Sequence, residues 1–359
     1  MTISIFPPQS LKGDRSRTGR LAIFVLIIIL FISIYCGLII GAYNVSVIDF
    51  IKAIHQNGFD TTAKVRNYLV LVNIRPPRII LGGLVGAALA VSGVLMQGLF
   101  RNPLADPGIM GVSSGAALGA VMMIVLCSLL PSTLITFLGG FNIAAGAFFG
   151  GLCTTTLLYY VATRNGRTSI ATMLLAGIAL GALCGAVLGL LIFIANDNQL
   201  RDITFWNLGS LAGATWMRVT IAFPFIATGL FIAPSLSRAL NALSLNEAVA
   251  GHLGFPVQRV KYIAIFLVAF MCGGAVAVSG NIGFIGIIVP HILRLTIGPD
   301  HRYLIPCSAL LGASLLILTD TVSRTIVAPA ELPIGIITSL IGGPFFLWIL
   351  LKQRGVVDQ

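Results

Sequence analysis

The chain has 359 residues, of which 57% are hydrophobic and 9% charged, and its formal net charge at pH 7 is +11. Soluble domains carry about a quarter charged residues, so this composition excludes an ordinary soluble protein and indicates a polytopic membrane protein. A span needs about 20 apolar residues, and the chain has room for about ten. The basic residues lie between apolar runs, so we interpret them as topology signals and expect no nucleic-acid partner.

The N-terminal region predicts the orientation of the first span. Four basic residues, Lys12, Arg15, Arg17 and Arg20, precede the first apolar run. That run is too long for the apolar core of a signal peptide. We therefore expect residues 1–20 to be a cytoplasmic tail and the first span to leave the cytoplasm.

The remaining apolar runs follow in chain order with mostly short connections. Residues 44–74 are mixed and polar, and we expect them to form an extracytoplasmic loop with some helix. Basic residues are depleted from the other outer turns, and an even number of spans places both ends of the chain in the cytoplasm. The sequence predicts an all-α membrane protein with one transmembrane domain over 21–354 and a second cytoplasmic tail at 355–359. The ten expected spans are 21–42, 79–99, 109–130, 134–161, 170–194, 219–236, 262–279, 282–297, 304–324 and 334–351.

Glycines recur four residues apart in two of these spans. Such spacing places them on one helix face, where the missing side chains let neighbouring backbones approach closely. The pattern predicts a tightly packed bundle and indicates nothing about the substrate. The two columns are Gly111, Gly115 and Gly119, and Gly177, Gly181, Gly185 and Gly189.

The stretch 241–256 is a short, mildly polar segment between two apolar runs. Ser244 and Glu247 have capping-box spacing, which predicts a helix start, and Gly251 and Gly254 can end short helical turns. Basic residues flank the segment, which favours the cytoplasmic side. Two interpretations stay open from these residues alone: a helical knob that docks a soluble partner, or a helix that lies among the lipid headgroups.

Chemistry within the chain is not expected. The dipeptide Gly-Lys does not occur, so the chain has no Walker loop for ATP. The six cysteines form no C-x-x-C pair and the four histidines are scattered, so we predict no catalytic residue, cofactor or metal site. Asp320 is the main carboxylate within a span, and Arg324 four residues later can neutralise it. An ion-coupled secondary transporter is therefore disfavoured, and it remains the alternative from another class.

Arginines mark the outer rim of the predicted bundle. Arg75 and Arg78 stand at the start of the second span, and Arg324 stands at the end of the ninth. Guanidinium groups fixed at helix ends can receive carboxylates of a soluble partner in bidentate fashion. Anchoring among headgroups is the alternative.

Several stretches together carry a family resemblance. R-P-P-R-I-I-L-G-G at 75–83, with its continuation to residue 116, G-N-I-G-F-I-G-I-I-V-P-H-I-L-R at 280–294, D-T-V-S-R at 320–324 and A-E-L-P-I-G at 330–335 resemble FecCD/cobalamin-type permeases of ATP-binding-cassette (ABC) importers. Pro76 stands where relatives often have Leu. The resemblance implies a cobalamin-permease-like bundle of ten helices, working as a homodimer in the lipid of the bacterial inner membrane. Two ATPase subunits would bind below and a periplasmic binding protein above.

The resemblance also implies roles for particular residues. Arg75, Arg78 and Arg324 would dock the binding protein, and Met96 and Gln97 are candidates for lining the pathway. The sequences of 100–108, 209–216 and 298–302 look most like those of haem permeases. A ferric siderophore or cobalamin is the alternative cargo. E-A-x-x-x-x-L-G resembles the segment that grips the ATPase, which implies a coupling role for Ser244, Asn246, Glu247, Ala248, Ala250, His252, Leu253 and Gly254.

Overall fold

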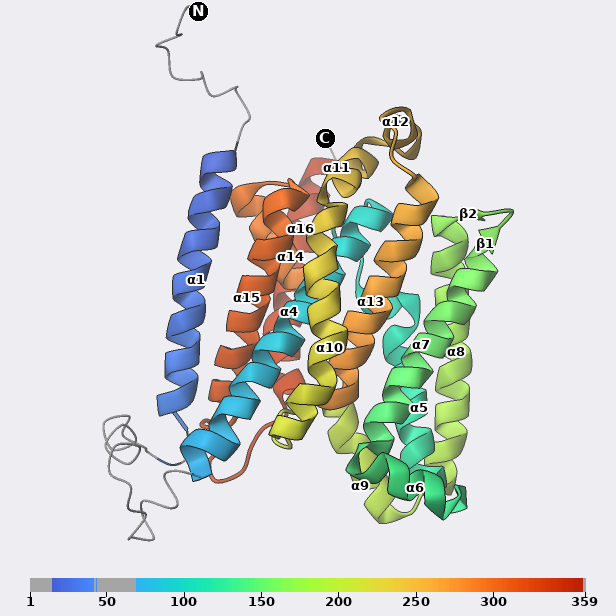
Figure 1. Ribbon diagram of the computed structural model, residues 1–359, viewed down its shortest axis with the longest axis vertical. Helices are drawn as coiled ribbons and strands as arrows, with labels where there is room; N and C mark the ends of the chain where they lie inside the picture. Colours follow the sequence, from blue (N-terminus) through green and yellow to red (C-terminus); the bar gives the residue numbers. More distant parts are fainter. Residues whose placement is uncertain (1–14, 42, 44–68, 358–359) are drawn as a thin grey trace, which may run out of the picture.

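A computed structural model describes residues 15–41, 43 and 69–357, and it is a bundle of roughly parallel and antiparallel helices (Figure 1). Residues 1–14 of the expected tail and most of the expected 44–74 loop lie outside the described residues. The α-helices are α1 (Ser16–Ile39), α4 (Arg75–Phe100), α5 (Val112–Leu126), α6 (Ser132–Leu138), α7 (Asn142–Ala162), α8 (Ile170–Ile194), α9 (Asp197–Leu208), α10 (Trp216–Ile232), α11 (Ser237–Leu245), α12 (Glu247–His252), α13 (Val257–Ser279), α14 (Ile285–Ile297), α15 (His301–Ser323) and α16 (Ile334–Val357).

Short elements connect these helices. A two-residue antiparallel hairpin joins α7 to α8, with Thr163 opposite Thr168. Its strands are β1 (Thr163–Arg164) and β2 (Arg167–Thr168), and the other connections include one π turn, η1 (Leu69–Ile74), and four 3-10 turns, η2 (Pro107–Met110), η3 (Cys127–Leu129), η4 (Gly139–Phe141) and η5 (Ala233–Leu236).

Each of the ten predicted spans corresponds to an apolar helix among the described residues. Eight helices are long and apolar enough to cross a membrane, and two shorter apolar helices, Ile285–Ile297 and Ile334–Ile349, match the eighth and tenth predictions. The fourth prediction began too early, because Gly139 has a positive φ and ends a separate short helix before α7 starts. The fold is an all-α bundle, as expected.

Helix α4 is the centre of the bundle and packs against α13, α14 and α15. Glycines make these crossings close. A Cβ on Gly93 would lie 1.9 Å from the carbonyl oxygen of Gly286 on α14, and one on Gly86 would lie 2.2 Å from that of Gly312 on α15. Any side chain at these crossings would separate the helices.

The two glycine columns differ in whether they pack against another helix of the same chain. The first column packs α5 against α7, since a Cβ on Gly119 would lie 2.0 Å from the carbonyl oxygen of Gly146. In the second column Gly177 is buried, whereas a Cβ on Gly185 or Gly189 would meet nothing within 4 Å. The prediction that this second column packs a neighbouring helix is wrong within one chain, because that part of α8 lies on the surface.

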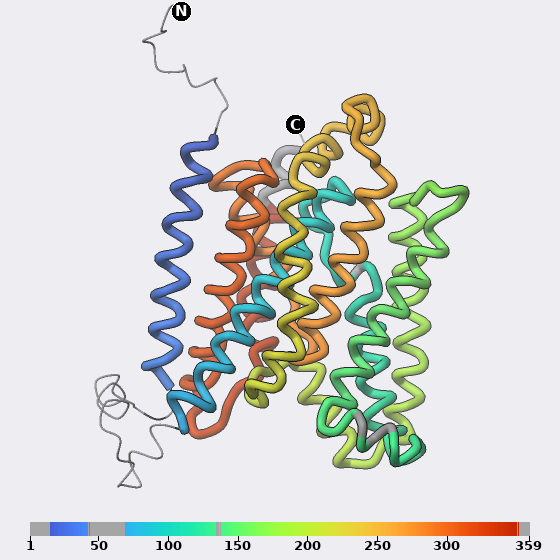
Figure 2. The backbone as a smooth tube through the Cα atoms, in the orientation of Figure 1, coloured from blue at the N-terminus to red at the C-terminus, as the bar shows by residue number. Residues whose placement is uncertain are grey.

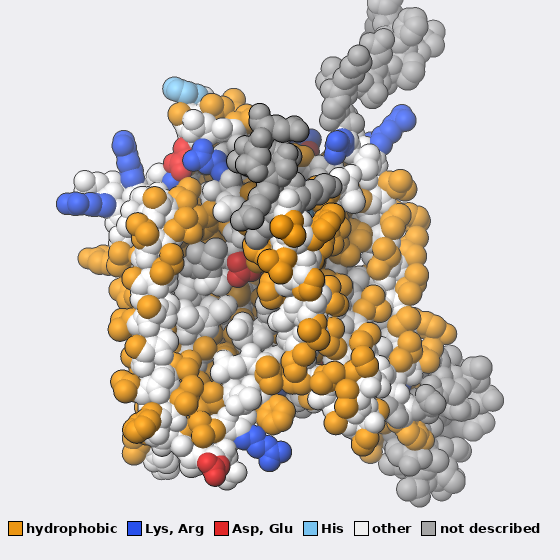
Figure 3. Space-filling model, turned by 180° about the vertical axis from the view of Figure 1, so that it is seen from behind, with side chains coloured by type: hydrophobic (Ala, Val, Ile, Leu, Met, Phe, Trp, Pro, Cys, Tyr) orange, Lys and Arg blue, Asp and Glu red, His pale blue; other side chains and the backbone are white. Residues whose placement is uncertain are grey.

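Polar groups concentrate at the two ends of the bundle. On the face seen in Figure 3, hydrophobic side chains cover the middle, and most charged side chains lie at the upper and lower margins. The backbone trace in Figure 2 shows that the turns near α12 lie at one end and α9 at the other. We call these the α12 end and the α9 end.

Candidate coupling and docking sites

The coupling segment forms two short helices, α11 and α12, at the α12 end (Figure 1). The predicted capping box is wrong. Helix α11 continues through Leu245, so Ser244 stays helical and its Oγ donates to the carbonyl of Asn241 at 2.6 Å. Asn246 is fully extended, with a φ of −175°, and α12 begins at Glu247. Gly254, with a φ of +84°, ends the turn that follows α12.

Glu247 serves as an anchor for α12. Its carboxylate lies 2.7 Å from Nζ of Lys261 on α13, and the Lys261 side chain is 3% exposed. Lys261 also donates to the backbone carbonyl of Thr168 at 2.9 Å, and the amide of Thr168 donates to Oε1 of Gln258 at 3.0 Å. A single buried ammonium group therefore joins α12, α13 and the β1–β2 hairpin.

Asn241 provides a second anchor, to the loop between α14 and α15. Its Nδ2 donates to Asp300 at 2.7 Å, and its Oδ1 accepts the backbone N–H of His301 at 2.9 Å. Burial favours the neutral form of Asp300, but hydrogen bonds from Arg302 and Asn241 outweigh it and lower the pKa of this carboxyl from 3.8 to about 2. The carboxylate is therefore ionised, and the anchor intact, at neutral pH.

The anchored segment presents an apolar surface outward. Leu245, Val249 and Leu253 are 70%, 39% and 61% exposed. Ser244, Asn246, Ala248, His252 and Gly254 are also exposed. Ala250 is fully buried on the inner side of α12, so it supports the segment and does not face outward.

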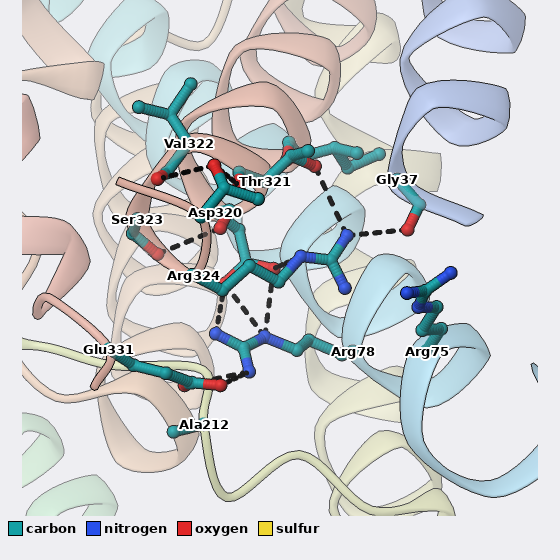
Figure 4. A network of polar contacts seen from close by, with 12 residues as sticks. Gly37, Arg75, Arg78, Ala212, Asp320, Thr321, Val322, Ser323, Arg324 and Glu331 are labelled. Carbon is teal, nitrogen blue, oxygen red and sulfur yellow. Dashed lines mark hydrogen bonds and ion pairs between the residues drawn. The ribbon is translucent and has the colours of Figure 1, made fainter. Parts of the chain in front are cut away.

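The three arginines lie at the α9 end, where Figure 4 shows Arg78 and Arg324 beside the carboxylate of Asp320 and Arg75 to one side. They are not on an exposed rim: Arg75, Arg78 and Arg324 are 3%, 5% and 5% exposed. Arg75 donates to the backbone carbonyls of Leu38 and Ile39, the last two residues of α1, and to that of Tyr43 just beyond it. Arginine here ties α4 to the end of α1.

Arg78 has the richest set of partners. Its Nε and Nη2 contact Asp320 at 2.9 and 2.8 Å, and its Nη1 donates to both oxygens of Glu331 at 3.0 Å. Asp320 is buried, whereas the Glu331 side chain is 39% exposed. The expected ion pair between Asp320 and Arg324 is present, at 3.9 Å, but the closer partner of Asp320 is Arg78 from another helix, at 2.8 Å.

Arg324 completes this network. Its Nη2 donates to the carbonyl of Gly37 and, at 3.4 Å, to the hydroxyl of Thr321, while its Nε is buried and has no hydrogen-bond partner. Three guanidinium groups and two carboxylates, Asp320 and Glu331, lie in this region, so these five side chains carry one excess positive charge. An additional carboxylate is therefore favoured at this end.

The suggested pathway residues do not face an open passage in this structure. Met96 is fully buried and Gln97 is 1% exposed. The Nε2 of Gln97 donates to the carbonyl of Gly286 at 3.1 Å, so the amide bridges α4 and α14. Both side chains belong to the core around α4, and their placement does not support a pathway role.

Sequence reasoning missed three residues of these sites. Glu331 stood within a quoted motif, Lys261 was treated only as a flanking charge, and Asn241 only as the start of the stretch. Their partners are 253, 14 and 59 residues away in the chain. No local spacing could have identified such pairs.

The fold and these sites define a multi-pass helical membrane protein with polar networks at both ends. The chain belongs to the FecCD transport family, whose model matches residues 26–352. The family resemblance is thus confirmed, and the chain is a permease of the ABC-importer type.

Several relatives are similar over most of the chain. The hemin transport system permease protein HmuU of Yersinia pestis is 48% identical over 285 residues, which cover 79% of this chain and 84% of that protein. The cobalamin import system permease protein BtuC of Halobacterium salinarum is 43% identical over 301 residues, which cover 84% of this chain and 77% of that protein. A solved inward-facing conformation of a metal-chelate type ABC transporter has a TM-score of 0.79 at 33% identity, covering 93% and 99%.

Proposed function

We propose that this chain is the haem permease of an ABC importer. The observation that supports haem as the cargo is the 48% identity to a hemin permease, against 43% for a cobalamin permease. Cobalamin or a ferric siderophore is the alternative cargo for the same machinery. The chain would receive haem from a soluble binding protein and pass it across the inner membrane.

Energy would come from a separate ATPase that grips α12. The chain has no Walker loop, and the exposed Leu245, Val249 and Leu253 form an apolar surface on a segment that two anchors hold in place. Rigid anchoring suits force transmission, because a partner that pushes on α12 also pushes on α13 and on the α14–α15 loop. This role places the α12 end, and both chain ends, in the cytoplasm.

The α9 end would then meet the binding protein through the arginine network. Glu331 already occupies Nη1 of Arg78 and is the only carboxylate of the network that is partly exposed among the described residues. A carboxylate from the binding protein would therefore compete with Glu331 for Arg78. Exchange of similar ion pairs costs little net energy, so docking would be reversible.

Two copies of the chain would form the passage. The exposed glycine positions of α8, Gly185 and Gly189, support this assembly, since a close helix crossing there requires a neighbour that one chain does not supply.

The test is transport by defined components. Proteoliposomes that hold this chain, its co-purifying ATPase and the binding protein should take up haem only with ATP. The binding protein should bind haem in preference to cobalamin and ferric siderophores. Cobalamin preference would reassign the cargo, and absence of any co-purifying ATPase would overturn the importer assignment.

A further inference from the structure

A groove of about 170 Å³ runs between α7 and α10 over the surface of α13. Gly274 and Ala277 of α13 form its floor, and Phe148 and Phe225 line its walls, with ring centroids 4.6 Å apart. The lining is almost wholly apolar. Such a groove on a membrane-embedded surface fits a hydrocarbon chain, because small residues on the floor leave space that lipid fills.

The groove leads into a polar pocket of about 340 Å³ at the α9 end. The two cavities share Phe141, Ala144, Ala277 and Val278 as lining residues. The polar pocket adds two charged groups, Arg218 of α10 and Asp202 of α9, together with Ser210 and Trp206. An apolar groove that opens into a charged pocket matches the two parts of an amphipathic molecule.

Arg218 is available for a ligand. Its guanidinium group lies on Gly213, where a Cβ would be only 2.6 Å from Nη1, so the loop is shaped around this group. Neither Arg218 nor Asp202 forms an ion pair with a described side chain. Ser210 Oγ accepts the amide of Ala212 at 3.1 Å, which leaves its hydroxyl proton to donate.

These groups match a zwitterionic headgroup. A guanidinium binds phosphate in bidentate fashion, and the Ser210 hydroxyl can add a third donor. A carboxylate in the same pocket accepts hydrogen bonds from a primary ammonium, whereas it repels a second anionic group. Trp206 and Trp216 lie at this end, as expected where hydrocarbon meets water.

We infer that this site binds one phospholipid with a phosphoethanolamine headgroup, its phosphate on Arg218, its ammonium on Asp202 and one acyl chain between α7 and α10. The inference does not depend on the cargo or on the ATPase. Its lining residues are not those of α12 or of the Arg78 network.

Lipid binding to the purified full chain tests this site. Native mass spectrometry would compare phosphatidylethanolamine, phosphatidylglycerol and phosphatidylcholine with identical acyl chains. We expect one tightly held phosphatidylethanolamine, with about tenfold weaker binding of the other two. Equal binding of all three lipids by the wild-type chain would overturn the inference without any variant.

Variants assign the parts of the site. Arg218→Gln should weaken phosphatidylethanolamine binding about 10- to 100-fold, as loss of a charge-assisted bidentate contact requires. Asp202→Asn should abolish the preference over phosphatidylglycerol, and Ala277→Leu should fill the groove and weaken all three lipids. Asp197→Asn changes an exposed charge on the same helix and should alter nothing.

Two results would contradict the site. One is unchanged binding in Arg218→Gln; the other is displacement of the lipid by inorganic phosphate alone or by haem at similar concentration, which would assign the pocket to a different ligand. If Arg218→Gln does not fold, Arg218→Lys keeps the charge and loses the bidentate geometry, and we expect it to weaken binding about tenfold.

Discussion

Replacement of Lys261 by Met removes the buried ammonium that joins α12, α13 and the hairpin while keeping the length of the side chain. Breaking a fully buried ion pair costs about 3–5 kcal/mol. Glu247 is 34% exposed, so its carboxylate regains hydration, and the loss should fall below that range. The lost hydrogen bond to Thr168 adds to the cost. We expect Lys261→Met to lose about 2–3 kcal/mol of anchoring free energy, which corresponds to about a 30- to 150-fold weaker anchoring of α12.

A double-mutant cycle measures this anchor. The dissociation constant between the permease in nanodiscs and its ATPase would be determined for Lys261→Met, for Glu247→Gln and for the double variant. Each single change should weaken the complex at least tenfold and reduce ATP-driven uptake. The double variant should be little worse than either, because both changes remove the same contact.

The control is Arg259→Met, which removes an exposed basic residue two positions earlier on α13. This variant should keep the affinity for the ATPase and the ATP-driven uptake within twofold of the wild-type values. Fully additive losses in the cycle, or wild-type affinity in Lys261→Met, would refute the anchoring role of this ion pair.

Four other substitutions have outcomes that follow from the geometry. Gly93→Ala should destabilise the folded chain by several kcal/mol in thermal unfolding, since its Cβ would overlap a carbonyl of α14, whereas Gly185→Ala should leave the isolated chain unchanged. Asp320→Asn should lower the free energy of unfolding by about 3–5 kcal/mol, because it removes a counter-charge of buried Arg78. Its unfolding temperature should fall accordingly. Glu331→Gln should strengthen binding-protein affinity about 3- to 10-fold in titrations at low salt, and equal or weaker affinity would exclude carboxylate exchange at Arg78.

The sequence predicted the spans well because span length and apolar composition are local properties. Ten segments and their order were expected, and each corresponds to an apolar helix. The exceptions have causes that hydropathy does not register. The helix before α7 breaks at Gly139, and α11 runs through Ser244 because tertiary anchoring at Asn241 outweighs a capping pattern.

The sites were harder to predict, since their function depends on partners distant in the chain. The arginines were correctly placed near one end, but their burial follows from Asp320, Glu331 and the end of α1, which only the fold brings together. Met96 and Gln97 were suggested as pathway candidates, and the sequence alone does not show which face of a central helix is open. Glu247 was assigned to the partner surface, whereas its carboxylate holds the segment in place from within.

The most direct test is haem transport by the purified chain in proteoliposomes, with and without its ATPase and binding protein. We expect no concentrative uptake by the chain alone under proton or sodium gradients, and ATP-dependent uptake once the partners are present. Concentrative uptake by this chain alone, driven by an ion gradient, would contradict its assignment as an ATP-driven permease and identify it as a secondary transporter.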